Sequence, residues 1–179
     1  HAMRVNLRGT EVVLDACARH RVPIVLFSSS EVYGDRAAGA LAETDPVSPG
    51  DTSRLRGSYG ASKALAEWAA LAHSRATGLP ALTVRLFNTI GPRQCAGHGM
   101  VLPRFVEAAK AGQPLNVHDD GKQQRCFAHV HDVVVAVLKL MDSDAALWRV
   151  FNIGSDQPIS ILDLATKVIR IAESSSVTE

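Results

Sequence analysis

A tyrosine and a lysine in the stretch Tyr59-Gly-Ala-Ser-Lys63 are the residues of this sequence best suited to acid–base chemistry. Residues four apart on a helix lie on one face, about one turn apart, so the two side chains are neighbours if residues 57–77 are helical. A phenol ordinarily titrates near about 10, and an adjacent ammonium favours its ionised form. Such a pair can remove a proton from a sugar or alcohol hydroxyl, although a solvated helix face without a function carries similar pairs.

A second group of polar side chains follows a short apolar run, in Ile24-Val-Leu-Phe-Ser-Ser-Ser-Glu-Val-Tyr-Gly34. The apolar residues after Pro23 predict a buried parallel strand over residues 24–30. Ligands of open parallel sheets bind just outside the carboxyl ends of the strands, which places Ser28–Ser30 and Glu31 where chemistry takes place. An ordinary loop also accepts serine and glycine.

Together, the strand-end serines and the Tyr59–Lys63 pair resemble the Ser/Thr–Tyr–Lys triad of the extended short-chain dehydrogenases/reductases. More narrowly, they resemble the NAD-dependent epimerase/dehydratase family, which acts on sugar nucleotides. Four further stretches are similar to that family in the same order along the chain: Val5–Thr10, Arg85–Arg93, Gly121–Val130 with Asp132, and Phe151–Gly154. The resemblance therefore covers nearly the whole chain, whereas a single Tyr-x-x-x-Lys would be weak.

The resemblance implies that bound NAD transiently oxidises a sugar at its 4-position. Tyr59 would remove the hydroxyl proton, Ser29 would hydrogen-bond the same oxygen, and Lys63 would hold the cofactor ribose and lower the pKa of Tyr59. Further contacts are implied with the cofactor for Asn6, Ser28 and Phe87, and with the substrate for Ser30, Asn88, Val117, His118 and Arg125. A guanidinium suits phosphate oxygens, but a surface arginine paired with Asp119 or Asp120 is the alternative for Arg125.

Glu31 bears on which branch of the family the chain resembles. The Ser30-Glu31 pair resembles that of the UDP-glucuronate decarboxylases, in which oxidation at C4 gives a β-keto acid that loses its carboxylate before the 4-keto sugar is reduced. There Glu31 would fix the sugar ring or shuttle a proton. A UDP-hexose 4-epimerase remains the alternative, because a strand-end carboxylate held by nearby amides would also place a glutamate here.

Alternating elements predict an α/β fold, a partial doubly wound (Rossmann-like) parallel sheet with part of a small substrate-binding region. Strands are expected at 24–30, 81–88 and 150–153, and helices at 3–20, 57–77, 102–111, 133–141 and 161–173. Asp132 and Ser160 are expected to cap the last two helices, and Gly78 to end the helix 57–77. A short strand over 115–118 would carry Val117 and His118, or would be a satellite hairpin. Residues 1–93 are expected to form the half of a Rossmann-like domain that carries the Ser-Tyr-Lys site, and 94–179 the substrate-binding segments with the last strand and helix.

The glycine-rich turn that cradles a dinucleotide pyrophosphate is absent, because neither G-x-G-x-x-G nor G-x-x-G-x-x-G occurs in the 179 residues. We therefore expect a fragment lacking the N-terminal NAD-binding half, which alone binds NAD weakly or not at all. A non-catalytic remnant serving as a dimeric interaction module is the alternative from another class. The resemblance also implies a homodimer through helices 3–20 and 57–77, and extra apolar surface on these helices is consistent with such pairing.

Composition excludes several other classes of protein. A net charge of +1 gives no reason to expect nucleic acid or an anionic membrane as a partner, and the apolar share of 46% is typical of a globular protein. No apolar run is long enough for a transmembrane helix, and no secretory leader is visible. Three scattered cysteines suggest reduced thiols in the cytoplasm, and the His129-Val-His131 pair lacks the ligand spacing of a metal site.

Overall fold

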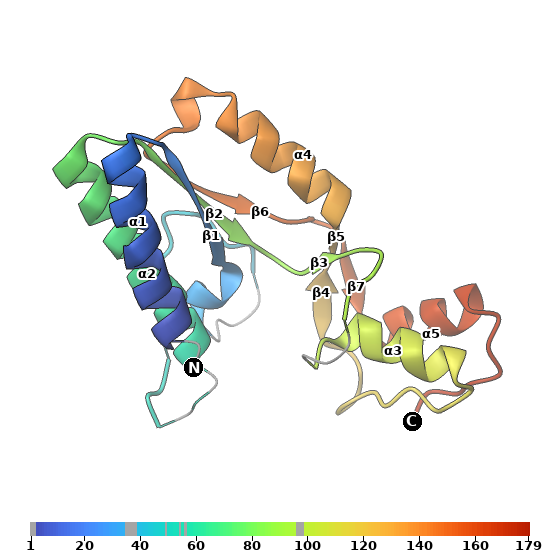
Figure 1. Cartoon of the computed structure of the whole chain (residues 1–179). Helices are drawn as coiled ribbons and strands as arrows, with labels where there is room; N and C mark the ends of the chain where they lie inside the picture. The colour runs from blue at the N-terminus through green and yellow to red at the C-terminus, as the bar shows by residue number, and fades with distance from the viewer. Residues whose placement is uncertain (1–2, 35–38, 49, 54, 56, 96–98) are drawn as a thin grey trace. The chain divides into compact units, whose positions relative to one another are not determined.

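The computed structural model describes residues 3–34, 39–48, 50–53, 55, 57–95 and 99–179 of the chain (Figure 1). These residues form two compact units. The first, here called the sheet unit, comprises His1–Phe87 and Val134–Ile153, and the second unit comprises Asn88–Val133 and Gly154–Glu179.

A three-stranded parallel sheet forms the centre of the sheet unit, with the strand order β1-β2-β6. Its strands are β1 (Ile24–Ser29), β2 (Ala81–Leu86) and β6 (Val150–Ile153). The central strand β2 pairs on both edges, and its first five residues are buried. Parallel strands require helical crossovers, and β1 is joined to β2 through a long helix. The expected α/β class with a Rossmann-like parallel sheet is confirmed.

Two helices pack side by side in the sheet unit (Figure 1). They are α1 (Gly9–His20), which follows a π-helical turn η1 (Arg4–Arg8), and α2 (Gly57–Thr77). Leu14 of α1 and Leu26 of β1 form a buried cluster with Ala66 and Ala70 of α2. Small alanines on α2 allow the helix to approach the strand closely. The predicted helices 3–20 and 57–77 are confirmed, and the helix 57–77 ends as expected at Gly78, whose φ is +71°.

The strand β1 ends one residue earlier than the sequence predicted. Ser29 caps the short 3₁₀ helix η2 (Ser30–Tyr33), because its Oγ accepts a hydrogen bond from the backbone N–H of Glu31 at 3.2 Å. This cap turns the chain away from the sheet directly after Ser29. Ser29 thereby occupies the carboxyl end of the strand.

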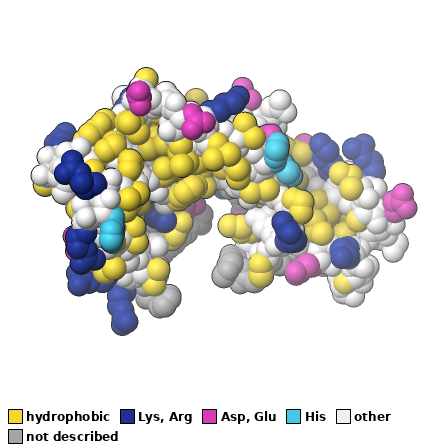
Figure 2. Space-filling view, turned by 45° about the horizontal axis from the view of Figure 1, so that its top comes forward, with side chains coloured by type: hydrophobic (Ala, Val, Ile, Leu, Met, Phe, Trp, Pro, Cys, Tyr) yellow, Lys and Arg dark blue, Asp and Glu magenta, His cyan; other side chains and the backbone are white. Residues whose placement is uncertain are grey.

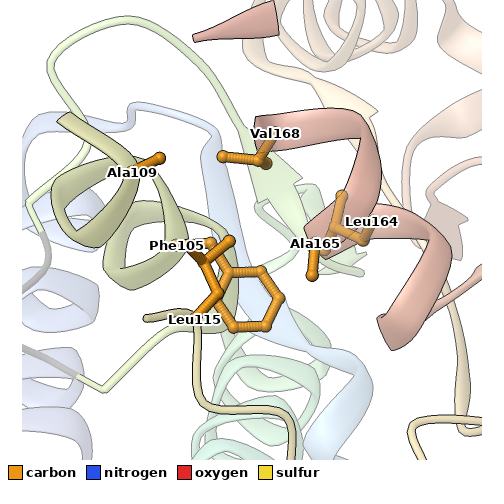
Figure 3. Close-up of a cluster of buried hydrophobic side chains, with 6 residues drawn as sticks. All are labelled: Phe105, Ala109, Leu115, Leu164, Ala165 and Val168. Atoms are coloured by element: carbon orange, nitrogen blue, oxygen red, sulfur yellow. The ribbon is translucent and has the colours of Figure 1, made fainter. Parts of the chain in front are cut away.

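The second unit is built around two helices, α3 (Val101–Lys110) and α5 (Ile161–Ile171). Their contact buries a cluster of apolar side chains (Figure 3): Phe105, Ala109, Leu115, Leu164, Ala165 and Val168. Short strands pair beside it, β3 (Thr89–Ile90) with β5 (Ala128–His129) and β4 (Gln124–Cys126) with β7 (Pro158–Ser160). Ser160 caps α5 as predicted, since its Oγ accepts from the N–H of Asp163 at 3.0 Å.

Two predicted features of this region are wrong. Residues 115–118 form no strand, because only Leu115 makes an isolated bridge, to Thr178. Asp132 does not cap its helix, because α4 (Val130–Met141) begins before it and places Asp132 in the first turn. A carboxylate is stabilised at either place by the exposed N–H groups of a helix start, so the sequence alone did not distinguish them. The 3₁₀ helix η4 (Asp144–Ala146) then leads towards β6.

Candidate active site

The predicted serines lie at the carboxyl end of β1 and face opposite sides of the strand, because side chains alternate along a strand. Ser28 is only 4% exposed, and its hydroxyl donates to a carboxylate oxygen of Glu67 on α2. Ser29 is half-buried and caps η2. Glu31, within η2, is exposed. The strand end thus presents Ser29 and Glu31 at the rim, while Ser28 bonds to the helix.

Tyr59 and Lys63 lie one turn apart on α2, as the spacing predicted. The Nζ of Lys63 is 5.9 Å from the centroid of the Tyr59 ring and donates to the backbone carbonyl of Phe27 at 2.8 Å. Desolvation by burial lowers the pKa of Lys63 below its ordinary value. Tyr59 itself is 43% exposed. The lysine therefore bonds to the strand two residues before Ser29, and the phenol beside it is accessible to a ligand.

Gly60 allows α2 to contact η2 directly. A Cβ at this position would lie 2.2 Å from the carbonyl oxygen of Glu31, a distance that no side chain tolerates. Only glycine permits the turn that carries Tyr59 to approach the serine-bearing end of β1 this closely. The second residue of the Tyr59–Lys63 stretch thus has a packing role that the spacing of the pair did not reveal.

Two predicted cofactor residues also lie in the sheet unit. Asn6, in η1, donates from Nδ2 to the Oγ of Ser62 at 2.9 Å, and that hydroxyl donates to the carbonyl of Tyr59 at 2.7 Å. Phe87 follows β2, and its N–H donates to the carbonyl of Ile153 at 2.9 Å. Asn6 is therefore linked through one hydroxyl to the Tyr59 turn of α2.

Sequence reasoning missed a buried ion pair between Arg85 of β2 and Glu67 of α2. Arg85 is 5% exposed, and its Nη2 and Nε lie 2.7 and 3.0 Å from the two carboxylate oxygens of Glu67. Its Nη1 donates to the hydroxyl of Tyr33 at 2.7 Å, and that hydroxyl donates to Oδ1 of Asn152 at 2.7 Å. Burial alone would lower the pKa of Arg85, but the bonds to Glu67 and Tyr33 raise it above its usual value.

A signal for this pair was present in the sequence. Glu67 follows Lys63 by the same spacing that separates Lys63 from Tyr59, so all three share one face of α2. Arg85 interrupts an apolar strand, and a charge in that position requires a partner. Arg85 and Glu67 are 18 residues apart, so the sequence alone did not identify Glu67 as the partner of Arg85.

The remaining predicted residues lie in the second unit. Asn88 donates from Nδ2 to the carbonyl of Cys126 at 3.0 Å. Val117 packs against the apolar cluster, and His118 is exposed. Arg125 is exposed on β4, and its Nη1 donates to the carbonyl of Gln124 at 2.8 Å.

Among the described residues, no group of three or more histidine, cysteine or acidic side chains is placed to hold a metal ion. Cys17, Cys95 and Cys126 are free thiols. None of the described helices has both the length and the hydropathy that a membrane span needs.

The model of the NAD dependent epimerase/dehydratase family matches residues 1–154. The chain belongs to this family. It is 38% identical over 97% of its length to UDP-N-acetyl-alpha-D-glucosaminuronate decarboxylase from Bacillus cytotoxicus, and 34% identical over 99% of its length to UDP-glucuronic acid decarboxylase 1 from Arabidopsis thaliana. It covers 54% and 40% of those proteins, so it spans about half the length of the curated relatives that it matches.

A solved structure is similar over nearly the whole chain. UDP-glucuronic acid 4-epimerase from Bacillus cereus, in complex with UDP-glucuronic acid and NAD, matches with a TM-score of 0.85 and 26% identity. The match covers 97% of this chain and 53% of that structure. The family expected from the sequence motifs is confirmed.

Proposed function

We propose that the protein is an NAD-dependent enzyme that modifies a sugar nucleotide through a transient 4-keto sugar. The observation that carries this proposal is the position of Lys63, whose ammonium bonds to the carbonyl of Phe27 while lying beside the exposed ring of Tyr59. The Tyr59 hydroxyl is thereby placed beside a fixed cation, where it would take the proton of a sugar hydroxyl.

The side chains around Lys63 fit the ribose end of NAD. An ammonium has three donor hydrogens, of which the bond to Phe27 uses one. Lys63 and Tyr59 would hold the ribose, with Asn6, Ser28 and Phe87 as further cofactor contacts. When bound, NAD supplies the acceptor for a hydride from C4 of the sugar and later returns it. The pyrophosphate-binding turn is not among the 179 residues of this sequence.

In the proposed chemistry, the Tyr59 phenolate takes the proton of the 4-hydroxyl, and Ser29 donates a hydrogen bond to the same oxygen. Removing the proton makes loss of hydride from C4 favourable, and the C4–O bond becomes a carbonyl. The same phenol returns its proton to O4 when the carbonyl is reduced. Each positioned proton transfer of this kind contributes about 10²–10⁴ in rate.

Within the family we propose a UDP-uronate decarboxylase. The support is the Ser30-Glu31 pair at the strand end together with the two decarboxylases to which the chain is similar. A 4-keto group lies β to the carboxylate, so the C–C bond electrons move towards the carbonyl as carbon dioxide leaves. Ser30 would contact the sugar, and Glu31 would orient the ring or deliver a proton to C5.

The second unit supplies candidate contacts for the nucleotide. We propose that Arg125 binds the diphosphate, because its guanidinium is exposed and its planar fork matches phosphate oxygens. Asn88 would contact the same group, and Val117 with His118 would lie against the base. In this proposal residues 1–93 carry the catalytic groups and 94–179 mainly the substrate contacts. Three free thiols are consistent with a cytoplasmic location.

A 4-epimerase is the second candidate, supported by the similar solved structure. The full-length protein, incubated with UDP-glucuronate or its 2-acetamido analogue and NAD, decides between them. Release of carbon dioxide with formation of a UDP-pentose is the expected result. A UDP-galacturonate product without carbon dioxide would establish the epimerase. No conversion of these or of neutral UDP-hexoses would contradict enzyme function and favour a non-catalytic interaction module.

A further inference from the structure

The carboxylate of Glu67 accepts hydrogen bonds from three donor groups in the interior of the sheet unit. It accepts the hydroxyl of Ser28 together with the Nε and Nη2 groups of Arg85. The side chains of Arg85 and Glu67 are 6% and 10% exposed. Neither residue has a role in the proton transfers assigned to Ser29 and Tyr59.

Glu67 continues the face of α2 that carries the proposed catalytic groups. Tyr59, Lys63 and Glu67 follow one another at intervals of four residues, so they stack along the helix. Lys63 bonds to β1 at Phe27, and Glu67 bonds to β1 at Ser28 and to β2 through Arg85. One buried side chain thus connects the catalytic helix with two strands of the sheet.

We propose that Glu67 and Arg85 are positioning residues, which hold the Tyr59–Lys63 helix in register with the serine-bearing end of β1. The expected loss of turnover when the pair is broken rests on the proposed function. The expected loosening of this end of β1 does not depend on that function.

The kind of contact matters for register. Apolar side chains such as Leu26 and Ala66 tolerate sliding of a helix along a strand, because their attraction is not directional. A guanidinium and a carboxylate bonded in a fork fix distance and plane together. Removing one partner also leaves a buried charge uncompensated, so the two elements would separate locally to admit water. Displacing a catalytic group by about 1 Å can cost about 10²-fold in rate.

Tyr33 extends this constraint to the residues after the strand. Its hydroxyl accepts a bond from Arg85 and donates to Asn152 of β6, and its ring lies 4.8 Å from the Arg85 guanidinium carbon. Tyr33 is the last residue of η2, which begins at Ser30. Arg85 therefore contacts the last residue of η2 directly, and through Glu67 it is linked to Ser28, two residues before η2 begins.

The test compares Glu67→Gln with Ser74→Ala in the full-length protein. Ser74 is a matched control because it is buried on the same helix and its hydroxyl bonds to the carbonyl of Leu79, at the far end of α2. Both changes remove a buried polar interaction of α2, but only Glu67 contacts the strands beside the proposed site. Hydrogen exchange is measured on peptides covering residues 24–33 and 57–67, at a temperature where both variants are folded.

Glu67→Gln should speed exchange by at least about tenfold in both peptides, whereas Ser74→Ala should leave residues 24–33 as in the wild type. Equal exchange at 24–33 in the two variants would overturn the proposal. If Glu67→Gln does not fold, Ser28→Ala, which removes only one donor to Glu67, takes its place with the same expected direction.

Turnover provides the second readout. For Glu67→Gln, kcat should fall by about 10- to 100-fold with KM changed less than about twofold, because the loss lies in alignment rather than in substrate binding. Ser74→Ala should keep the kcat of the wild type. A kcat that falls equally in both variants would indicate general destabilisation and contradict positioning. If the wild type converts no sugar nucleotide, the proposed function fails, and the exchange result still decides whether the pair holds the strand end.

Discussion

Tyr59 and Tyr33 are the two tyrosines of the chain. Their surroundings differ, so the hydroxyl of Tyr59 is expected to serve function and that of Tyr33 to serve stability. The Tyr59 ring is 43% exposed beside Lys63, whereas Tyr33 is fully buried and bonds to Arg85 and Asn152. A hydroxyl at an accessible surface contributes little to stability, while a buried one leaves its partners unsatisfied when it is removed. Function and stability can therefore be separated at these two positions.

We predict that Tyr59→Phe keeps the fold and lowers turnover by about 10²–10⁴, because it removes the proposed base and nothing that supports the core. Tyr33→Phe should instead lower the free energy of unfolding by about 1–3 kcal/mol. Steady-state rates of the full-length protein and urea unfolding of each variant check both statements. Turnover at the wild-type level in Tyr59→Phe would contradict the assignment of the base.

The protonated form of Lys63 is expected to lower the free energy of unfolding, because burial disfavours its charge. Burial lowers its pKa, so the folded state holds the proton less tightly than the unfolded state does. The resulting destabilisation is fully present below the folded-state pKa and disappears as the pH rises through the ordinary lysine value of about 10.4. We predict that the stability of Lys63→Met relative to the wild type is higher at about pH 7 than at about pH 10. Thermal unfolding at the two pH values measures this difference, and a relative stability that rises with pH would contradict the cause given.

At the scale of elements, the contact between α2 and η2 depends on Gly60, and Gly9 offers a helical glycine without such a contact for comparison. A Cβ at Gly60 would meet the backbone of Glu31 at 2.2 Å, whereas a Cβ at Gly9 of α1 would meet nothing within 4 Å. We predict that Gly60→Ala lowers stability by about 1–3 kcal/mol through overpacking and also lowers turnover, because it pushes the Tyr59 turn away from the strand end.

Gly9→Ala is the matched control for that prediction. Alanine in an unobstructed helical position should raise stability by about 0.5–1 kcal/mol and leave turnover unchanged. Chemical unfolding and activity of the two variants are compared in parallel. Equal stability of Gly60→Ala and the wild type would show that α2 and η2 have room to separate without cost.

The sequence predicted those elements whose signals are local. The helix 57–77 was defined by its apolar face and by Gly78, and the serine strand by the run that begins at Ile24. Elements fixed by distant partners were not predictable in this way. Leu115 pairs with Thr178, 63 residues later in the sequence, and a segment with a single bridge lacks the alternation that marks a strand.

The same limit applies to the candidate site. Tyr59 and Lys63 were found because their spacing is local, and the resemblance to the family supplied Ser29. The Arg85–Glu67 pair was missed, since no local pattern says which carboxylate satisfies a buried arginine. Gly60 was also missed as a packing residue, because what it contacts is the backbone of another element.

At the scale of the whole molecule, the sheet unit exposes apolar side chains on both of its paired helices. Many hydrophobic side chains are visible on the surface of the sheet unit, at the left of Figure 2. Besides Tyr59, the large exposed apolar residues of α1 and α2 are Val12, Val13, Leu65, Trp68 and Leu71. Leu14, by contrast, is 3% exposed and belongs to the core, so it is not available to a partner. The helices thus have one apolar face turned to the sheet and a second turned outward.

We predict that this outward face pairs with the same face of a second copy, because a symmetric contact buries both patches at once. Trp68 is 58% exposed on α2, and large aromatic side chains dominate the energy of such interfaces. Trp68→Glu should therefore convert a dimer to a monomer at micromolar concentration, as measured by sedimentation velocity. Ile171→Glu, a charge placed at a 71% exposed apolar residue of α5 in the second unit, should leave the dimer intact. A wild-type protein that sediments as a monomer at every concentration would rule the pairing out, and a dimer that survives Trp68→Glu would place the contact elsewhere.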